Sequence, residues 1–161
     1  MTEAGNVVAD TVAELGEDFD RERVLSRLAD WRDRVHRLYD EVEAELGGDY
    51  AYDRQGKYLS QEAVVQRAGL RSSDVPPIDI LRVRSPSGSS AVFLPRHLWM
   101  IGANGRIDLF VVPKTGLGRR HFMLIDVSRP LAGPSDWRLV FPAERLDELP
   151  FHVHALRELL A

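Results

Sequence analysis

The chain has 161 residues, of which 44% are hydrophobic and 29% are charged, with a formal net charge of −4 and no cysteine. This length and composition fit one globular domain with a hydrophobic core and exclude a disordered chain. The lack of cysteine excludes disulfides and thiolate metal sites. No run approaches the roughly 18 apolar residues of a membrane helix. We therefore expect a single domain over residues 1–161 with no membrane contact.

The charge is unevenly distributed along the chain. Residues 1–60 carry 8 basic and 15 acidic side chains, whereas residues 61–161 carry 13 basic and 10 acidic ones. This small basic excess is weak for a nucleic-acid-binding surface, so no nucleic-acid partner is expected. Only two lysines, Lys57 and Lys114, accompany abundant arginine. That bias is typical of GC-rich coding and indicates a high-GC bacterium.

Residues 1–17 predict a loosely attached helix or, alternatively, a frayed tail. Partial helical spacing is seen in Val7, Val8, Val12 and Leu15. The segment is acidic and lacks the basic start and apolar run of a secretory signal. We therefore expect the protein in the cytoplasm.

Residues 20–46 predict a long helix that ends at Gly47-Gly48. Its apolar residues recur at alternating steps of four and three: Val24, Leu28, Trp31, Val35, Leu38 and Val42. Such a heptad seam packs on the core of its own domain or, alternatively, docks a partner helix or a second copy. On the second interpretation the interface candidates are Val24, Leu28, Trp31, Val35 and Leu38.

Residues 49–59 predict a polar connector, followed by a short helix over 61–68. The stretch 59–75 (LSQEAVVQRAGLRSSDV) resembles the first helix, glycine turn and second-helix start of bacterial helix-turn-helix regulators. That resemblance implies DNA reading by a recognition helix of two or more turns. Pro76-Pro77 stops such a helix almost at its start, so DNA reading is not expected here.

From Ile78 onward the apolar pattern is that of strands. The apolar segments are 78–84, 90–94, 97–102, 106–112, 120–127 and 137–141. Asn104-Gly105 predicts a tight hairpin turn, and short turns imply antiparallel neighbours. Trp99 lies in one of these segments, and its exposure would mark an interface. A final helix is predicted to begin at Pro150.

Together these elements predict an α+β fold. The long N-terminal helix and the C-terminal helix pack on one face of an antiparallel sheet of about five strands.

Two aspartates fall in neighbouring predicted strands. Residues 105–109 (GRIDL) and 124–129 (LIDVSR) resemble the sheet of the PD-(D/E)xK nucleases. The resemblance implies that Asp108 and Asp126 hold magnesium, while a lysine two residues after the second acid helps activate water. Ser128 stands at that lysine position, and the loop 129–136 takes the place of the family's following helix.

Strand register decides between the roles of these aspartates. A loop centred near residue 116 predicts that facing residue numbers sum to about 232, which pairs Asp126 with Arg106 in a structural ion pair. A sum larger by two would place Asp108 opposite Asp126, close enough to share a metal ion. An odd sum would separate them onto opposite faces of the sheet.

Residues 114–121 (KTGLGRRH) predict an anion-binding hairpin. Its two glycines allow backbone amides to approach a phosphate, and the candidate ligands are Lys114, Arg119, Arg120 and His121. The alternative is a solvated hairpin tip whose arginines discourage pairing between sheet edges.

The five histidines predict neither a metal nor a cofactor site. His152 and His154 lie two apart on the predicted final helix, which does not give the metal-binding spacing of four. His36, His97 and His121 are expected at surface or half-buried positions. No nucleophile and base pair is evident.

The sequence therefore favours a small, non-enzymatic bacterial binding protein of accessory or immunity type, with a protein partner or self-association. The alternative is a degenerate or divergent PD-(D/E)xK-like metal-dependent nuclease, or another enzyme acting on a phosphate ligand. Its candidate catalytic residues are Asp108 and Asp126.

Overall fold

The computed structural model describes residues 21–57, 63–100, 103–129, 132–141 and 149–161, with the backbone alone for 57, 63–64 and 97–100. The prediction for residues 1–17 lies outside this range. Seven antiparallel strands follow one another in chain order across a single sheet. They are β1 (Ala51–Lys57), β2 (Ile78–Arg84), β3 (Ser90–Met100), β4 (Ala103–Val112), β5 (Arg120–Asp126), β6 (Trp137–Val140) and β7 (Leu149–Pro150).

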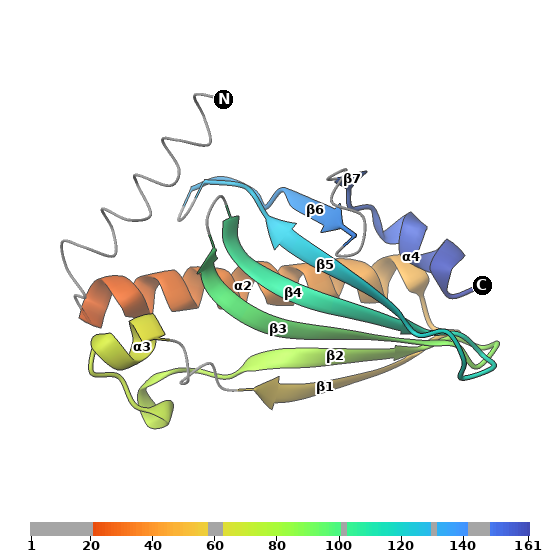
Figure 1. The fold of residues 1–161 in the computed structure, drawn as a ribbon, viewed down its shortest axis with the longest axis horizontal. Helices are drawn as coiled ribbons and strands as arrows, with labels where there is room; N and C mark the ends of the chain where they lie inside the picture. The colour runs from red at the N-terminus through yellow and green to blue at the C-terminus, as the bar shows by residue number, and fades with distance from the viewer. Residues whose placement is uncertain (1–20, 58–62, 101–102, 130–131, 142–148) are drawn as a thin grey trace.

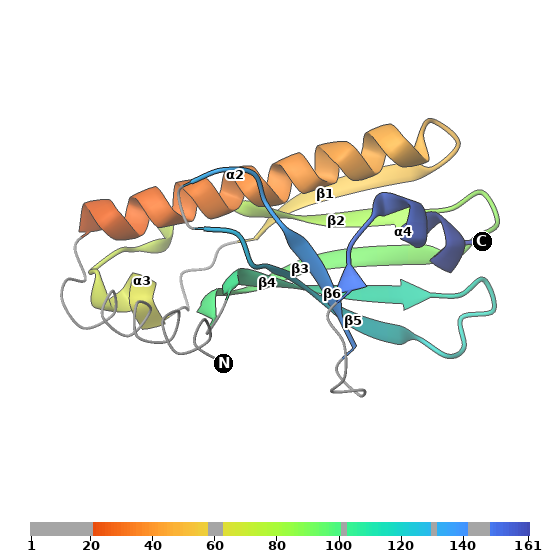
Figure 2. The ribbon, with the colours of Figure 1, turned by 90° about the horizontal axis from the view of Figure 1, so that it is seen from above.

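The described helices are α2 (Arg21–Leu46), α3 (Ala63–Arg67) and α4 (Val153–Leu159), with a 3-10 turn η1 (Ser72–Asp74). Two of them, α2 and α4, cover one face of the sheet. Figures 1 and 2 show α2 lying along one side of the sheet, with α4 beside its C-terminal half on the same side. The predicted α+β class, with both helices on one face, is confirmed. The sheet has seven strands where about five were predicted.

The heptad seam of α2 is buried in the core of its own chain. The exposed fractions are 3% for Val24, 1% for Leu28, 2% for Trp31, 0% for Val35 and 2% for Leu38. The seam packs against inward-facing residues of the strands, including Phe93, Leu109 and Phe122. Burial against the sheet leaves no surface for a partner helix, so these five residues do not form the alternative interface. The side chain of Trp99, the sixth interface candidate, lies outside the described residues.

Three sequence-based predictions of secondary structure were wrong. Residues 51–57, predicted as a connector, form β1 at the sheet edge. Asn104 and Gly105, predicted as a turn, lie inside β4, where Gly105 pairs with Leu98. Pro150 belongs to β7, and the final helix begins three residues later. Each error concerns a chain segment that tertiary pairing keeps extended against its local preference.

A β-bulge interrupts the pairing of β3 with β4. Pro95 faces Ile107 and His97 faces Arg106, so Arg96 is the extra residue. Proline cannot donate to a ladder and is found in central strands mainly at such bulges. Pro95 therefore explains why two predicted segments, 90–94 and 97–102, form one strand with an irregularity between them.

Side chains of α2 also bind the start of β2. Arg32 Nε donates to the Pro77 carbonyl at 3.1 Å, and Tyr39 Oη donates to the Asp79 carbonyl at 2.7 Å. His36 Nε2 accepts the Asp79 amide at 3.1 Å. Burial lowers the pKa of His36 more than the nearby Asp79 carboxylate raises it, and Arg32 and Arg54 lower it further. The neutral imidazole is therefore the form that this contact requires.

The C-terminal end of the chain is held by serines of the β2–β3 turn. Ser89 Oγ donates to the Leu160 carbonyl at 2.5 Å, and Ser85 Oγ lies 2.6 Å from Ser89 Oγ. Arg157 donates to the Glu45 carbonyl at the end of α2. These contacts fix α4 against both layers.

In its described part, residues 63–75, the segment that resembles a helix-turn-helix does not contain a recognition helix. After α3, Gly69 adopts a φ of 70°, and the following element η1 covers only three residues before Pro76. None of the helices in the described residues combines the length and apolar character needed to cross a membrane.

Candidate functional site

The two aspartates lie on opposite faces of the sheet. Asp108 faces Met123 and Arg106 faces Ile125, so the facing residue numbers have an odd sum. The predicted pairing of Asp126 with Arg106 is therefore wrong by one residue, which turns every side chain of β5 to the other face. Asp126 points inward, toward α2, and Asp108 lies on the outer face. This arrangement does not let the two carboxylates share a metal ion.

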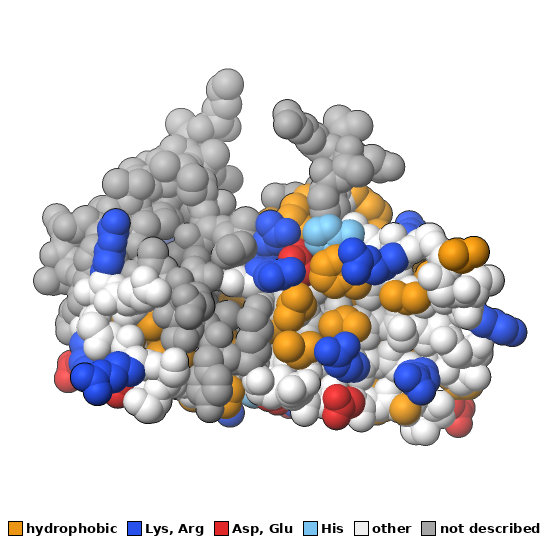
Figure 3. All heavy atoms as spheres, turned by 60° about the horizontal axis from the view of Figure 1, so that its bottom comes forward, with side chains coloured by type: hydrophobic (Ala, Val, Ile, Leu, Met, Phe, Trp, Pro, Cys, Tyr) orange, Lys and Arg blue, Asp and Glu red, His pale blue; other side chains and the backbone are white. Residues whose placement is uncertain are grey.

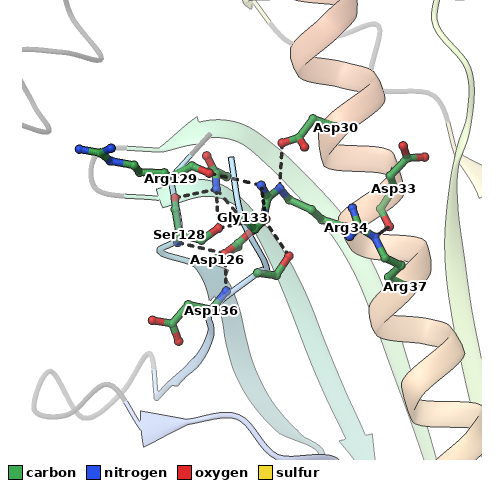
Figure 4. Close-up of polar contacts among 11 residues, drawn as sticks. Asp30, Asp33, Arg34, Arg37, Asp126, Ser128, Arg129, Gly133 and Asp136 are labelled. Carbon is green, nitrogen blue, oxygen red and sulfur yellow. Dashed lines mark hydrogen bonds and ion pairs between the residues drawn. The ribbon is translucent and has the colours of Figure 1, made fainter. Parts of the chain in front are cut away.

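Around Asp126, a buried polar cluster connects α2 to the end of the sheet (Figure 4). Arg34, 2% exposed, donates through Nε to Asp30 at 2.8 Å and through Nη1 to Asp126 at 3.5 Å. Nη1 also reaches Ser128 Oγ at 2.9 Å and Ser135 Oγ at 3.1 Å. Nη2 donates to the carbonyls of Arg129 and Gly133 at 3.3 and 3.2 Å.

Asp126 is fully buried, and each of its two carboxylate oxygens accepts two hydrogen bonds. Its Oδ1 accepts the backbone amides of Ser128 at 3.1 Å and Asp136 at 2.9 Å. Its Oδ2 accepts from Arg34 and from Asn104 Nδ2 at 3.3 Å. Every guanidinium nitrogen and both carboxylate oxygens thus have partners within the chain. This cluster around Arg34 and Asp126 therefore holds residues 127–129 and 132–136 against α2, and its charges are engaged within the chain.

A second polar cluster lies on the outer face of the sheet. Asp108 Oδ1 accepts Arg106 Nε at 2.8 Å, forms an ion pair with Arg106 Nη2 at 2.7 Å and lies 3.0 Å from His121 Nε2. Its Oδ2 accepts Arg96 Nε at 2.9 Å. We call these four residues the outer cluster. The side chain of Asp108 is 5% exposed, but those of Arg96, Arg106 and His121 are 44%, 24% and 35% exposed.

Asp108 remains ionised in this setting. Burial acts to raise its pKa, but the hydrogen bonds and charges of His121, Arg106 and Arg96 outweigh burial, so the pKa lies below its usual value. One carboxylate thus holds two guanidinium groups and an imidazole in fixed positions. The bulge in β3 places the side chain of Arg96 against Asp108. Bulges are frequent where a strand redirects a side chain.

Phe110 extends the outer cluster along the same face. It pairs with His121 across β4 and β5, and the two rings stack with centroids 4.6 Å apart. The guanidinium carbon of Arg119 lies 4.7 Å from the centroid of the Phe110 ring. The ring is therefore already engaged by two side chains of its own chain.

Half-buried aliphatic side chains surround the outer cluster. Leu94, Asp108, Met123 and Val140 form one row across four strands, and Val92 and Ile125 lie in the rows on either side. We call the apolar members the aliphatic strip: Val92, Leu94, Met123, Ile125 and Val140. Each is intermediate in exposure. Figure 3 shows hydrophobic side chains on this face directly beside basic ones, a histidine and a carboxylate.

Figures 1 and 2 show no described helix over this outer face. The apolar side chains of the strip therefore lie on an open surface of the described chain, next to organised charges.

The predicted anion-binding residues do not converge in the structure. Arg119 and His121 lie on the outer face against Phe110, whereas the guanidinium of Arg120 lies over Phe122, 4.9 Å from its centroid and on the other face. Lys114 is exposed near the β2–β3 turn. A phosphate site formed by all four remains a prediction that this geometry does not favour.

Of the described histidines, only His121 belongs to the outer cluster. His152 and His154 line a pocket of about 420 Å³ between α2 and the start of α4, together with Trp137 and Glu41. Within the described ranges no group of three or more histidine or acidic residues is arranged to hold a metal ion.

Sequence analysis missed Arg34 and Arg96 as organising residues. Arg34 was hidden among the charged residues of a helix, because all of its partners except Asp30 lie more than 90 positions away. Arg96 follows a proline within a strand pattern, and that proline was a usable signal for a bulge.

Comparison with protein-family models, curated proteins and solved structures gives no match for this chain.

Proposed function

We propose that this chain is a non-enzymatic binding protein of the bacterial cytoplasm that docks a protein partner on the outer face of its sheet. The observation that carries the proposal is the aliphatic strip, whose half-buried side chains lie beside the outer cluster on a face that no described helix covers. The face of an antiparallel sheet that contacts only water usually carries polar side chains at its outward-pointing positions. Apolar patches bordered by charged groups are typical of interaction surfaces.

The charged residues support binding rather than catalysis. Asp108 is held by three side chains and is 5% exposed, so its oxygens are not available to a substrate. Asp126 is saturated on the opposite face. The geometry required by a shared-metal nuclease is not formed by these two residues, whereas positioned arginines next to apolar side chains are common at the centres of protein interfaces.

The test is a comparison of captured proteins in lysate of the native host. Leu94→Glu places a charge within the aliphatic strip, and Leu117→Glu makes the same change at a hairpin tip where the side chain is 77% exposed. We expect wild type and Leu117→Glu to retain the same protein and Leu94→Glu to lose it. Met123→Glu, on the neighbouring strand, should also lose it.

Thermal unfolding of each variant shows whether the fold is kept. Equal capture by wild type and by folded Leu94→Glu and Met123→Glu proteins would contradict the proposal.

A further inference from the structure

We infer that the partner presents an acidic segment, with carboxylates that meet Arg96 and Arg106 and aliphatic side chains that meet the strip around them. This inference rests on the proposed function and specifies the chemistry of the partner. It depends on three features of the outer face: the sign of its charges, the way Asp108 holds them, and the kind of apolar residue beside them.

The described outer face is predominantly basic. Its register places Arg82 beside Val92, Arg106 beside Ile125, and Arg138 on the far side of Ile125. The basic side chains on or above this face are Arg82, Arg84, Arg96, Arg106, Arg119 and Arg138. The carboxylates beside them are Asp53, which faces Arg82, together with Asp108 and Asp136. Charge complementarity therefore favours an acidic occupant.

Asp108 positions the arginines without using all of their donors. A guanidinium has five N–H donors in a fixed plane. Asp108 accepts Nε of Arg96 and Nε of Arg106, and Nη2 of Arg106 lies in an ion pair with the same carboxylate. Since 44% of Arg96 and 24% of Arg106 remain exposed, part of each cation faces the surface. Arginines held in this way bind a carboxylate with less loss of side-chain freedom.

The apolar residues favour a polypeptide over a nucleic acid. Single-stranded nucleic acids bind sheets through exposed aromatic rings on which bases stack. Among the described side chains of this face, the ring of Phe110 already stacks with His121 and Arg119, and the other apolar side chains are those of Val, Leu, Ile and Met. Aliphatic side chains pack well against similar side chains of a protein and offer little to a base.

The test uses three fluorescent probes in anisotropy titrations with the full chain. The first is a short peptide of repeating Glu-Leu-Glu-Ser, the second has glutamine in place of each glutamate, and the third is an oligodeoxythymidine of the same length. We expect the acidic peptide to bind best, and its affinity to fall as salt rises from about 50 to about 200 mM, because exposed charges are screened.

Matched variants locate the site. Arg106→Gln and Arg96→Gln should each weaken the acidic peptide about tenfold, while Arg37→Gln should leave its affinity unchanged. Arg37 is exposed on α2, away from the sheet, where its Nε donates to the Asp33 carbonyl. Arg37→Gln therefore removes the same positive charge from the helical layer, away from the proposed binding face.

Several outcomes would overturn the inference. Equal binding of the glutamine peptide would show that charge plays no part, and tighter binding of the oligonucleotide would assign the face to nucleic acid. No binding of the acidic peptide, or equal weakening by Arg37→Gln, would also reject it. If Leu94→Glu still abolished capture of the host protein, the proposed function would survive every one of these outcomes except tighter binding of the oligonucleotide.

Discussion

Asp126 and Arg34 illustrate how a residue's role depends on which face of a strand it occupies. Asp126 was a candidate for catalysis because it lies in a predicted strand next to that of Asp108, in a pattern that resembles the PD-(D/E)xK nucleases. In the structure it accepts two backbone amides and a guanidinium while fully buried. Removing one partner from such a group leaves an uncompensated buried charge, which is costly.

We therefore expect Asp126→Asn to lower the free energy of unfolding by about 3–5 kcal/mol, because an amide would turn a donor toward Arg34 or Asn104. Urea unfolding measures the change. Asp136→Asn is the control. The side chain of Asp136 is 47% exposed in its ion pair with Arg138, so this pair should contribute less than about 1 kcal/mol to the free energy of unfolding. A similar small loss in both variants would refute the role assigned to Asp126.

His36 gives the protein a pH dependence of known sign. Its pKa in the folded state is lowered, chiefly by burial. The unfolded chain therefore takes up the proton first as pH falls. Stability from this residue is fully present above about pH 6.5, falls as pH drops toward the folded pKa, and is constant below it.

We expect wild type to lose stability between about pH 7 and pH 5 by more than a His36→Gln variant, in which glutamine can still accept the Asp79 amide. The comparison is made by urea unfolding across this range. Parallel pH profiles for the two proteins would show that His36 is not the titrating group.

At the scale of elements, the predictable parts were those with strong local patterns. The heptad seam predicted α2 and its end at Leu46, and the alternating residues of 78–84 coincide with β2. The turn at Asn104-Gly105 was wrong, because the long pairing of β3 with β4 extends past it.

The candidate site depended on register, which local sequence does not fix. A shift of one residue between β4 and β5 decided that Asp108 meets Arg106 and that Asp126 meets α2. Arg34 contacts Ser128, Arg129, Gly133 and Ser135, all more than 90 positions away, so no local pattern predicts these contacts. The outer cluster could be found only once the faces of the strands were known.

The burial of the seam makes a prediction about α2. Leu38→Ala should lower the free energy of unfolding by about 2–5 kcal/mol, because it leaves a cavity between helix and sheet. The solution mass by light scattering should stay that of wild type, since the seam makes no contact between chains. A change in mass with little change in unfolding midpoint would restore the interface interpretation of this helix.

At the scale of the whole molecule, the two layers present surfaces of opposite charge. The exposed side of α2 carries acidic residues such as Glu41 and Glu45, whereas the outer face of the sheet carries the arginines around Asp108. Such a distribution orients an approaching charged partner before contact is made. The sheet therefore serves both as the support of the core and as the proposed docking surface.

The most direct measurement is methyl NMR of the full chain, titrated with the protein that wild type captures and Leu94→Glu does not. Docking on the outer face predicts shifted methyl signals for Leu94, Met123 and Ile125, with those of Leu28 and Leu38 in the core unchanged. Shifts confined to the helical layer, for example at the exposed Ala44 of α2, with unchanged signals from the strip, would contradict it.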